Sequence, residues 1–259
     1  MKSSIRAEFR KLLSVRSTYF IALIALALIA FLAFYVQGFK NSATDSSSLF
    51  LAGTVTMMAS ITSVFAGITA LLLLAHEYRY NTIIYTLTAS NSRSKVLFSK
   101  ILVIMLYVLI FSLALGALGV GLVSVGVAVS GHHIVHQDIN YLSYLAKVIF
   151  YSEGYALAAL LFIALIRNQV GALAALFIIP GTVEGLLSLL LKHNSVYMPF
   201  TGLSQVIQPP TLPGAMADKA HEAAAGYLSA PRGALVFLAY LVFGWVIAWY
   251  LFLRRDAIS

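Results

Sequence analysis

The chain has 259 residues, of which 61% are hydrophobic and only 10% are charged. Its apolar residues recur in runs of about 20, the length at which one helix crosses a hydrocarbon core of about 30 Å. The composition therefore predicts an all-α membrane protein with a single transmembrane domain over residues 1–259. The absence of cysteine excludes disulfides, thiolate catalysis and cysteine metal sites.

Six spans are expected, preceded by a cationic amphipathic helix at residues 1–16 that lies on the membrane surface. The expected spans are about 18–38, 49–75, 101–129, 141–166, 170–191 and 234–253. The third is long enough to be tilted, or interrupted near its glycines Gly116, Gly119 and Gly121. Residues 192–233 hold five of the six prolines and are partly apolar, which suggests an external re-entrant helical region.

The basic residues are distributed unequally between the two sides of this topology. With both termini in the cytoplasm, the cytoplasmic side carries twelve of the 17 Lys and Arg residues and the other side carries five. This bias supports the orientation, because cytoplasmic loops are enriched in Lys and Arg. The same clustering beside apolar runs explains the formal charge of +8 through anionic headgroups and predicts no nucleic-acid partner.

A polar, basic segment separates the second span from the third. Residues 77–98 are helix-compatible and lie on the expected cytoplasmic side, where an amphipathic helix could face lipid or a protein partner. A helical stripe is formed by Tyr80, Ile83, Ile84 and Leu87. Uncharged polar neighbours such as Asn81 and Thr82 favour a protein partner over an anchor that only contacts headgroups.

Motifs for chemistry are largely missing from the sequence. No phosphate loop of the form G-x-x-x-x-G-K-[ST] occurs, so we expect this chain to be no ATPase and to bind no cofactor itself, and any use of ATP must depend on another subunit. An external group of His132, His133 and His136, with Asp138, is a weak candidate metal site, because histidines beside a membrane are more often merely solvated.

Two acids fall inside expected spans and are candidates for a translocation pathway or for gating. Glu153 is placed near the midplane and Glu184 in the outer third. A carboxylate in hydrocarbon must find a partner, face water or be protonated. A structural hydrogen-bonding role is therefore an equal alternative for Glu184 and the favoured one for Glu153, whose neighbours Tyr151, Ser152 and Tyr155 offer local partners. Ser60 and Ser63 in the second span could line the same conduit or permit close helix packing.

The sequence resembles the permeases of the type-2 ABC exporter family. The pieces that carry the resemblance are the basic start leading into the first span, EYRYNTIIYTLTASNSRSKVLFSK at 77–100, PGTVEGLL at 180–187, YMPF at 197–200 and the terminal RRDA. The second of these is similar to the family's E-[YF]-R-x-x-T-x-x-x-x-L segment. Two positions depart from the pattern, because Asn81 stands where glycine is frequent and Gly185 stands where proline often follows Glu184.

The resemblance implies a cytoplasmic coupling helix that docks on a separate ATPase, which would bind ATP and Mg. Its candidate coupling residues are Glu77, Tyr78, Arg79, Tyr80, Thr82, Ile83, Ile84 and Leu87. It also implies a second permease subunit, the same or a related chain, in the plasma membrane of a prokaryote. The alternative is a secondary transporter with two three-span halves and no ATPase, which would be built on helices broken at matching positions. The sequence indicates neither the cargo nor whether the two permease subunits are identical.

Overall fold

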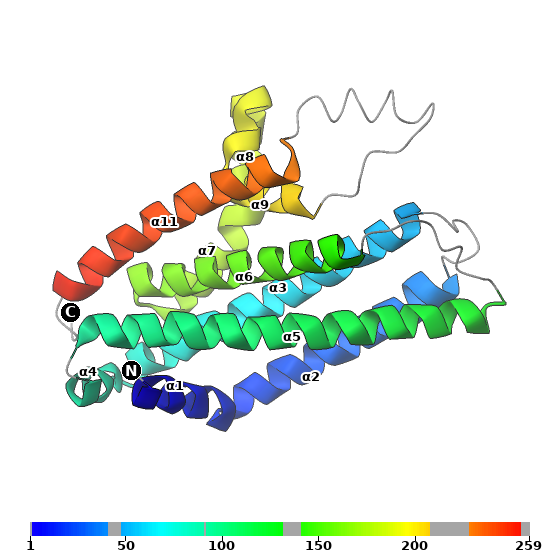
Figure 1. The fold of residues 1–259 in the computed structure, drawn as a ribbon. Coiled ribbons are helices and arrows are strands. Elements are labelled where there is room, and N and C mark those ends of the chain that lie inside the picture. The colour runs from blue at the N-terminus through cyan, green and yellow to red at the C-terminus, as the bar shows by residue number, and fades with distance from the viewer. Residues whose placement is uncertain (1, 41–47, 91, 132–140, 208–227, 255–259) are drawn as a thin grey trace.

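The computed structural model describes residues 2–40, 48–90, 92–131, 141–207 and 228–254, and every regular element in these ranges is helical (Figure 1). Six of the helices are long and apolar enough to cross a membrane: Arg16–Lys40, Thr56–Arg79, Arg93–Val129, Leu145–Ile166, Gln169–Tyr197 and Ala230–Arg254. The expected all-α class with six spans is confirmed. The predicted metal group at His132, His133 and His136 lies outside the described residues.

The chain begins with α1 (Lys2–Ser14), which bends into α2 (Arg16–Phe31) at Val15. Val15 has φ −84° and ψ 120°, an extended conformation that ends one helix and starts the next at a new angle. The apolar face of α1 packs inward, with Leu12 2% exposed. The first span continues from α2 through η1 (Leu32–Lys40), which is wound as a π-helix.

The centre of the bundle is built by α3 (Ser48–Arg79), α5 (Arg93–Val129) and α6 (Tyr141–Ile166), which lie side by side in Figure 1. Small residues let α3 and α6 approach closely, as is typical of helix packing in membranes. The ring of Tyr155 lies where a Cβ on Gly67 would be, at 2.9 Å, and the Tyr155 hydroxyl donates to the carbonyl of Leu176 at 3.0 Å. These two helices therefore form the interior of the bundle, while α2 lies at its outside.

The fifth span is divided around Pro180 into α7 (Gln169–Ile178), η2 (Ile179–Val183) and α8 (Glu184–Leu191). Proline has no N–H to donate, and the local π-winding of η2 accommodates this loss. In Figure 1 this span runs across the direction of α6, with α8 at the edge of the molecule. Its side chains are exposed there, with Leu189 73% and Leu190 78% exposed.

The last elements are η3 (Lys192–Tyr197), α9 (Pro199–Val206) and α11 (Ala230–Arg254). The short helix α9 packs against α11 and α6, so the expected helical structure after the fifth span is present, although its re-entrant character stays a prediction. The end of α11 lies beside the start of α5, where Arg93 Nη1 donates to the carbonyls of Phe252 at 3.4 Å and Leu253 at 3.3 Å. In Figure 1 this end of α11 and α1 lie at the same end of the bundle.

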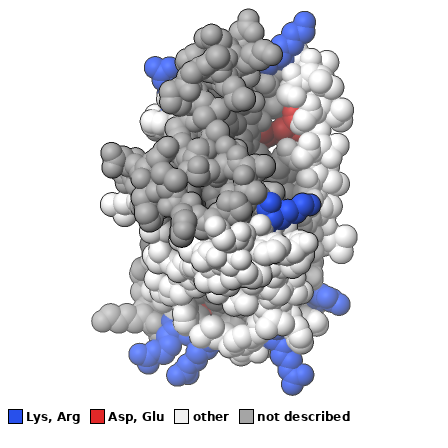
Figure 2. Space-filling view, turned by 90° about the vertical axis from the view of Figure 1, so that its right-hand side faces the viewer, with Lys and Arg blue, Asp and Glu red and all other residues white. Residues whose placement is uncertain are grey.

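The surface at the opposite end is shown in Figure 2. Most of the surface that is not grey in this view is neither acidic nor basic; Lys and Arg side chains lie around its margins and also near its middle, and acidic atoms are visible beside the grey region.

Two sequence expectations about helix boundaries are corrected by the structure. Residues 77–79 complete α3, and residues 93–98 begin α5, so the segment expected at 77–98 is a shorter connection that contains α4 (Ile83–Ser90). The third span was expected to be either tilted or interrupted, and the structure excludes the interruption, because α5 is continuous past its glycines. The third span therefore offers the secondary-transporter alternative no second broken helix beside the one at Pro180.

A close approach between η1 and α5 predicts a strong effect of one methyl group. A Cβ on Gly126 would lie 2.5 Å from the carbonyl oxygen of Phe34 and 2.8 Å from Gly38 Cα. We expect Gly126→Ala to lower the free energy of unfolding by about 1–3 kcal/mol, because backbone must move to accept it. The measurement is an unfolding titration in mixed detergent micelles. Gly121→Ala in the same helix is the matched control, since nothing lies within 4 Å of its Cβ position; equal stability of the two variants would contradict the packing.

Candidate coupling site

The connection between the second and third spans is a tight turn followed by α4. Helix α3 ends at Arg79, and Asn81 then adopts φ 55°, in the left-handed region. Glycine and asparagine enter this region most readily. The sequence departure from glycine at this position is therefore conformationally conservative.

A cluster of four charges, three of them buried and the fourth, Lys11, partly exposed, holds this connection to the rest of the chain. Lys100 Nζ donates to Glu8 Oε2 at 2.6 Å and to Glu77 Oε1 at 2.8 Å. Lys11 Nζ donates to Glu77 Oε1 at 2.7 Å, to Glu8 Oε1 at 2.9 Å and to Thr86 Oγ1 at 3.0 Å. The cluster, defined by Glu8, Lys11, Glu77 and Lys100, thus joins α1, α3 and α5, with α4 attached through Thr86.

The electrostatics of the cluster are balanced, with two carboxylates and two ammonium groups. Lys100 is 0% exposed, Glu8 2% and Glu77 5%, so each charge depends on its partners for stabilisation. Burial lowers the pKa of the Lys11 ammonium, but its hydrogen bonds and charge interactions with Glu77 and Glu8 outweigh this and raise that pKa above its ordinary value. Lys11 is therefore charged at neutral pH. One acceptor is left over, because Glu77 Oε2 is buried with no hydrogen-bond partner.

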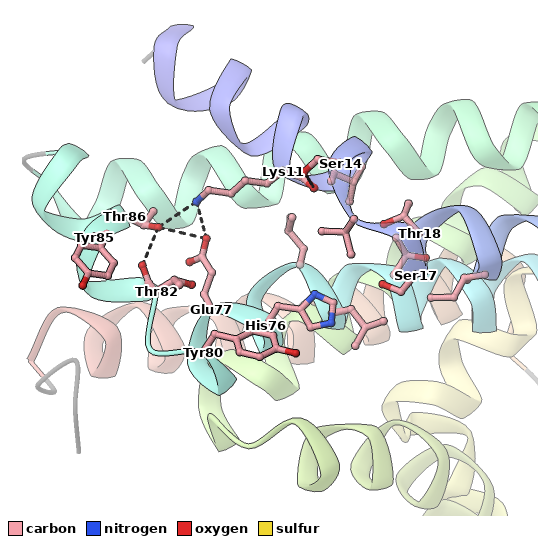
Figure 3. A pocket seen from close by; sticks show the side chains of 16 residues that line it. Lys11, Ser14, Ser17, Thr18, His76, Glu77, Tyr80, Thr82, Tyr85 and Thr86 are labelled. Atoms are coloured by element: carbon pink, nitrogen blue, oxygen red, sulfur yellow. Dashed lines mark hydrogen bonds and ion pairs between the residues drawn. The ribbon is translucent and has the colours of Figure 1, made fainter.

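A pocket of about 400 Å³ opens beside the cluster, between the α1–α2 bend, the end of α3 and the start of α4 (Figure 3). Its apolar wall includes Ile21, Leu72 and Leu73. Its other lining residues include Tyr80 and Tyr85, which are 63% and 75% exposed. The site therefore combines the charge cluster, an apolar cavity and two exposed tyrosines.

Comparison with known families identifies the kind of protein to which this site belongs. A sequence profile described as "ABC-2 family transporter protein" matches residues 4–183, well over half of the chain, including the cluster and the whole connection. The chain belongs to the ABC-2 transporter family. No curated protein matches the sequence. As an ABC-2 protein, the chain is a multi-pass membrane subunit of an ABC transporter. Permeases of the ABC-2 family lack an ATPase of their own and act with an ABC ATPase.

The structure divides the eight predicted coupling residues of this ABC-2 subunit into three groups. Arg79, Tyr80 and Thr82 are exposed, whereas Tyr78, Ile84 and Leu87 are half-buried and pack against the core. Glu77 and Ile83 are buried, Ile83 being 2% exposed. The expectation that Tyr80, Ile83, Ile84 and Leu87 form one outward stripe is therefore wrong, because the turn at 80–82 rotates α4 so that Ile83 faces the interior.

Sequence reasoning missed several residues at this site. Glu8 and Lys100 lie 92 positions apart, and only tertiary structure brings them together. A signal was present at Glu8 alone, because an acid in the apolar stripe of α1 requires a partner. Tyr85 was also missed, although it is the single aromatic residue of α4 and is 75% exposed.

Glu184 lies far from this site and holds the N-terminus of α9. Its Oε1 accepts from the Phe200 backbone N–H at 2.8 Å, and its Oε2 accepts from the Thr201 N–H at 2.7 Å and the Thr201 hydroxyl at 2.8 Å. A helix N-terminus has unsatisfied donors and favours negative charge. The geometry therefore supplies the partners that a buried carboxylate in a span needs, while the predicted pathway role stays a prediction.

This arrangement predicts that Glu184→Ala lowers the free energy of unfolding by about 1–3 kcal/mol, because two backbone donors lose their acceptor. Glu184→Gln should lose less stability, since it retains one side-chain oxygen. Unfolding titration of the purified permease measures both effects. If Glu184→Ala is as stable as the parent protein but changes export, Glu184 acts in the pathway and not as a cap.

The other pathway candidates differ in their surroundings. The hydroxyl of Ser60 donates to the carbonyl of Thr56 at 2.9 Å, and that of Ser63 donates to the carbonyl of Ser60 at 2.8 Å. Both serine hydroxyls therefore donate hydrogen bonds to backbone carbonyls of their own helix, α3. Glu153 is half-buried and its Oε2 is buried with no hydrogen-bond partner. Of the expected local partners of Glu153, the Tyr155 hydroxyl donates to the Leu176 carbonyl instead, and the Ser152 hydroxyl is buried with no hydrogen-bond partner. A pathway role for these three residues stays a prediction.

Proposed function

We propose that this chain is the permease subunit of an ATP-driven exporter and that residues 79–86 form its contact with a separate ATPase subunit. The observation that carries the proposal is the exposure of Tyr80 and Tyr85 on a connection that the buried cluster fixes to α1, α3 and α5. Exposed tyrosines with uncharged polar neighbours suit a protein interface. Because the charge cluster ties the connection to α1, α3 and α5, a force on the connection is transmitted to the spans.

The cluster indicates how such a contact acts on the membrane domain. ATP and Mg bind to the partner, and nucleotide binding favours one arrangement of the two ATPase subunits over another. A displacement of the connection pulls on the ends of α3 and α5 and on α1 together, because Glu77, Lys100, Glu8 and Lys11 join them. The spans then move as rigid bodies.

A second permease subunit completes the proposed transporter. The exposed leucines of α8 and the outward position of the fifth span offer an apolar face for such a subunit within the membrane. With both termini at the same end of the bundle and the basic excess on that side, we place α1, α4 and the end of α11 in the cytoplasm of a prokaryote.

The experiment that tests this function starts from native membranes. Tagged permease is purified, the co-purifying ATPase is identified by mass spectrometry, and both are reconstituted in liposomes. We expect the permease to stimulate ATP hydrolysis by that ATPase. Purified permease that associates with no ATPase and transports on an ion gradient alone would contradict the proposal.

A further inference from the structure

Helix α1 turns its apolar stripe and its acid toward the bundle. Leu12 and Glu8 are each 2% exposed, and Ile5 and Phe9 pack against the same core. An amphipathic helix that binds a membrane through its apolar face needs that face free. Because protein already covers the apolar stripe of α1, any contact of this helix with lipid is made by another part of its surface.

The side of α1 that remains exposed is basic. Arg6, Arg10 and Leu13 recur at i, i+4 and i+7, so they lie on one face, and all three are exposed, Leu13 at 41%. Glu8 is the single acid in the sequence of α1, and it lies on the buried side. The free face of α1 therefore carries positive charge that no carboxylate of the same helix offsets.

The arginines of this face are available to an outside partner. Within the described ranges, all four ion pairs lie inside the cluster at the candidate coupling site, and none of them involves Arg6, Arg10 or Arg16. Arg16, the first residue of α2, is exposed like the other two. A guanidinium presents its N–H donors in a planar fork that matches the oxygens of a phosphate. Three such groups favour an anionic partner that carries phosphate.

The position of the face indicates that this phosphate belongs to a lipid. The first span begins at Arg16, so the arginines lie where that span enters the membrane. Tyr19 and Phe20 follow and are 57% and 64% exposed, and aromatic residues beside basic ones are typical of a membrane–water interface. Figure 1 shows α1 and α2 along one flank of the bundle. Leu13, exposed between the arginines, suits the boundary between headgroups and acyl chains.

We propose that the face of α1 formed by Arg6, Arg10 and Leu13, and continued by Arg16, binds an anionic phospholipid. The guanidiniums donate to the phosphate oxygens, and Leu13 contacts the start of an acyl chain. A bound lipid also stabilises the packed position of α1, from which Glu8 reaches Lys100 in the cluster. The proposal holds whether or not residues 79–86 contact an ATPase.

Native mass spectrometry of the purified full chain tests the proposal by measuring lipid retention. The probe is phosphatidylglycerol, and zwitterionic phosphatidylcholine is the comparison. We expect the parent chain to prefer phosphatidylglycerol and the double variant Arg6→Gln with Arg10→Gln to bind it about tenfold more weakly or worse, because each basic residue beside an anionic surface contributes about fivefold. Equal affinity of the parent chain and the double variant for phosphatidylglycerol would overturn the proposal.

Two further double variants show whether the loss comes from these positions. Arg6→Lys with Arg10→Lys keeps both charges and should retain affinity within about threefold. Lys192→Gln with Arg232→Gln removes two exposed charges from η3 and from the start of α11, and should leave the affinity within about twofold. If this control loses as much affinity as the glutamine variant of α1, the lipid responds only to net charge and the proposal fails.

The stability of the permease provides a second measurement. Phosphatidylglycerol added to mixed micelles should raise the unfolding midpoint of the parent chain and leave that of Arg6→Gln with Arg10→Gln unchanged, because a ligand stabilises only the state that binds it. A parent chain whose midpoint does not respond would contradict the proposal. A double variant that binds the lipid normally but loses affinity for a co-purifying ATPase would assign the face to a protein contact instead.

Discussion

Replacing Lys100 with methionine is expected to lower the free energy of unfolding by about 3–5 kcal/mol, the range for removing one partner from a buried ion pair. Lys100 is 0% exposed and contacts both carboxylates of the cluster. Without it, Glu8 and Glu77 share only the ammonium of Lys11, and one negative charge is left buried and uncompensated. The measurement is an unfolding titration of the purified permease in mixed detergent micelles.

The control for this prediction comes from the same helix. Lys95 is exposed, and Lys95→Met removes the same charge and should change stability by less than about 0.5 kcal/mol. The double variant Glu8→Gln with Lys100→Met should recover part of the loss, because it removes a carboxylate together with its partner. Equal effects of Lys100→Met and Lys95→Met would mean that the cluster does not stabilise the fold.

Replacing Tyr85 with aspartate is expected to abolish stimulation of the ATPase and export while leaving the inserted permease at its normal yield. Tyr85 is 75% exposed, so the change hardly affects the core of this chain, but a charge in a docked apolar contact is strongly unfavourable. Tyr80→Asp should act in the same direction. ATP hydrolysis and cargo transport in proteoliposomes, with permease content measured by immunoblot, check both variants.

The matched control for these variants is Tyr197→Asp. Tyr197 is 52% exposed but belongs to η3, which follows the fifth span and lies outside the proposed contact. It should retain ATPase stimulation. Normal turnover by both Tyr80→Asp and Tyr85→Asp would place the ATPase elsewhere on the permease.

Much of the architecture follows from features that are local in the sequence. Apolar runs longer than a bilayer and the amphipathic stripe of α1 predict six spans and a helix before the first of them, because length and periodicity are properties of one segment. The segment at 77–98 was identified for the same reason, since its polarity interrupts two apolar runs. The interpretation of its surface was less accurate, because the rotation of α4 depends on the left-handed turn at Asn81.

The buried cluster could not be predicted from local features. Lys100 adjoins an apolar run like several other basic residues that remain exposed, and nothing in the sequence distinguishes it. Its pairing with Glu8 depends on how α1 packs against α5, which is a tertiary contact. Likewise, the donors that face the Glu184 carboxylate, the N–H groups of Phe200 and Thr201, are identified only once the position of α9 is known.

A single labelled position tests the central claim most directly. With no native cysteine, Tyr85→Cys can carry one spin label on the reconstituted permease, and Tyr197→Cys provides the reference position. We predict that adding the ATPase immobilises the label at position 85 and leaves the label at position 197 unchanged. Immobilisation at neither position, or at position 197 alone, would contradict the assignment of residues 79–86 as the contact that couples the ATPase to this permease.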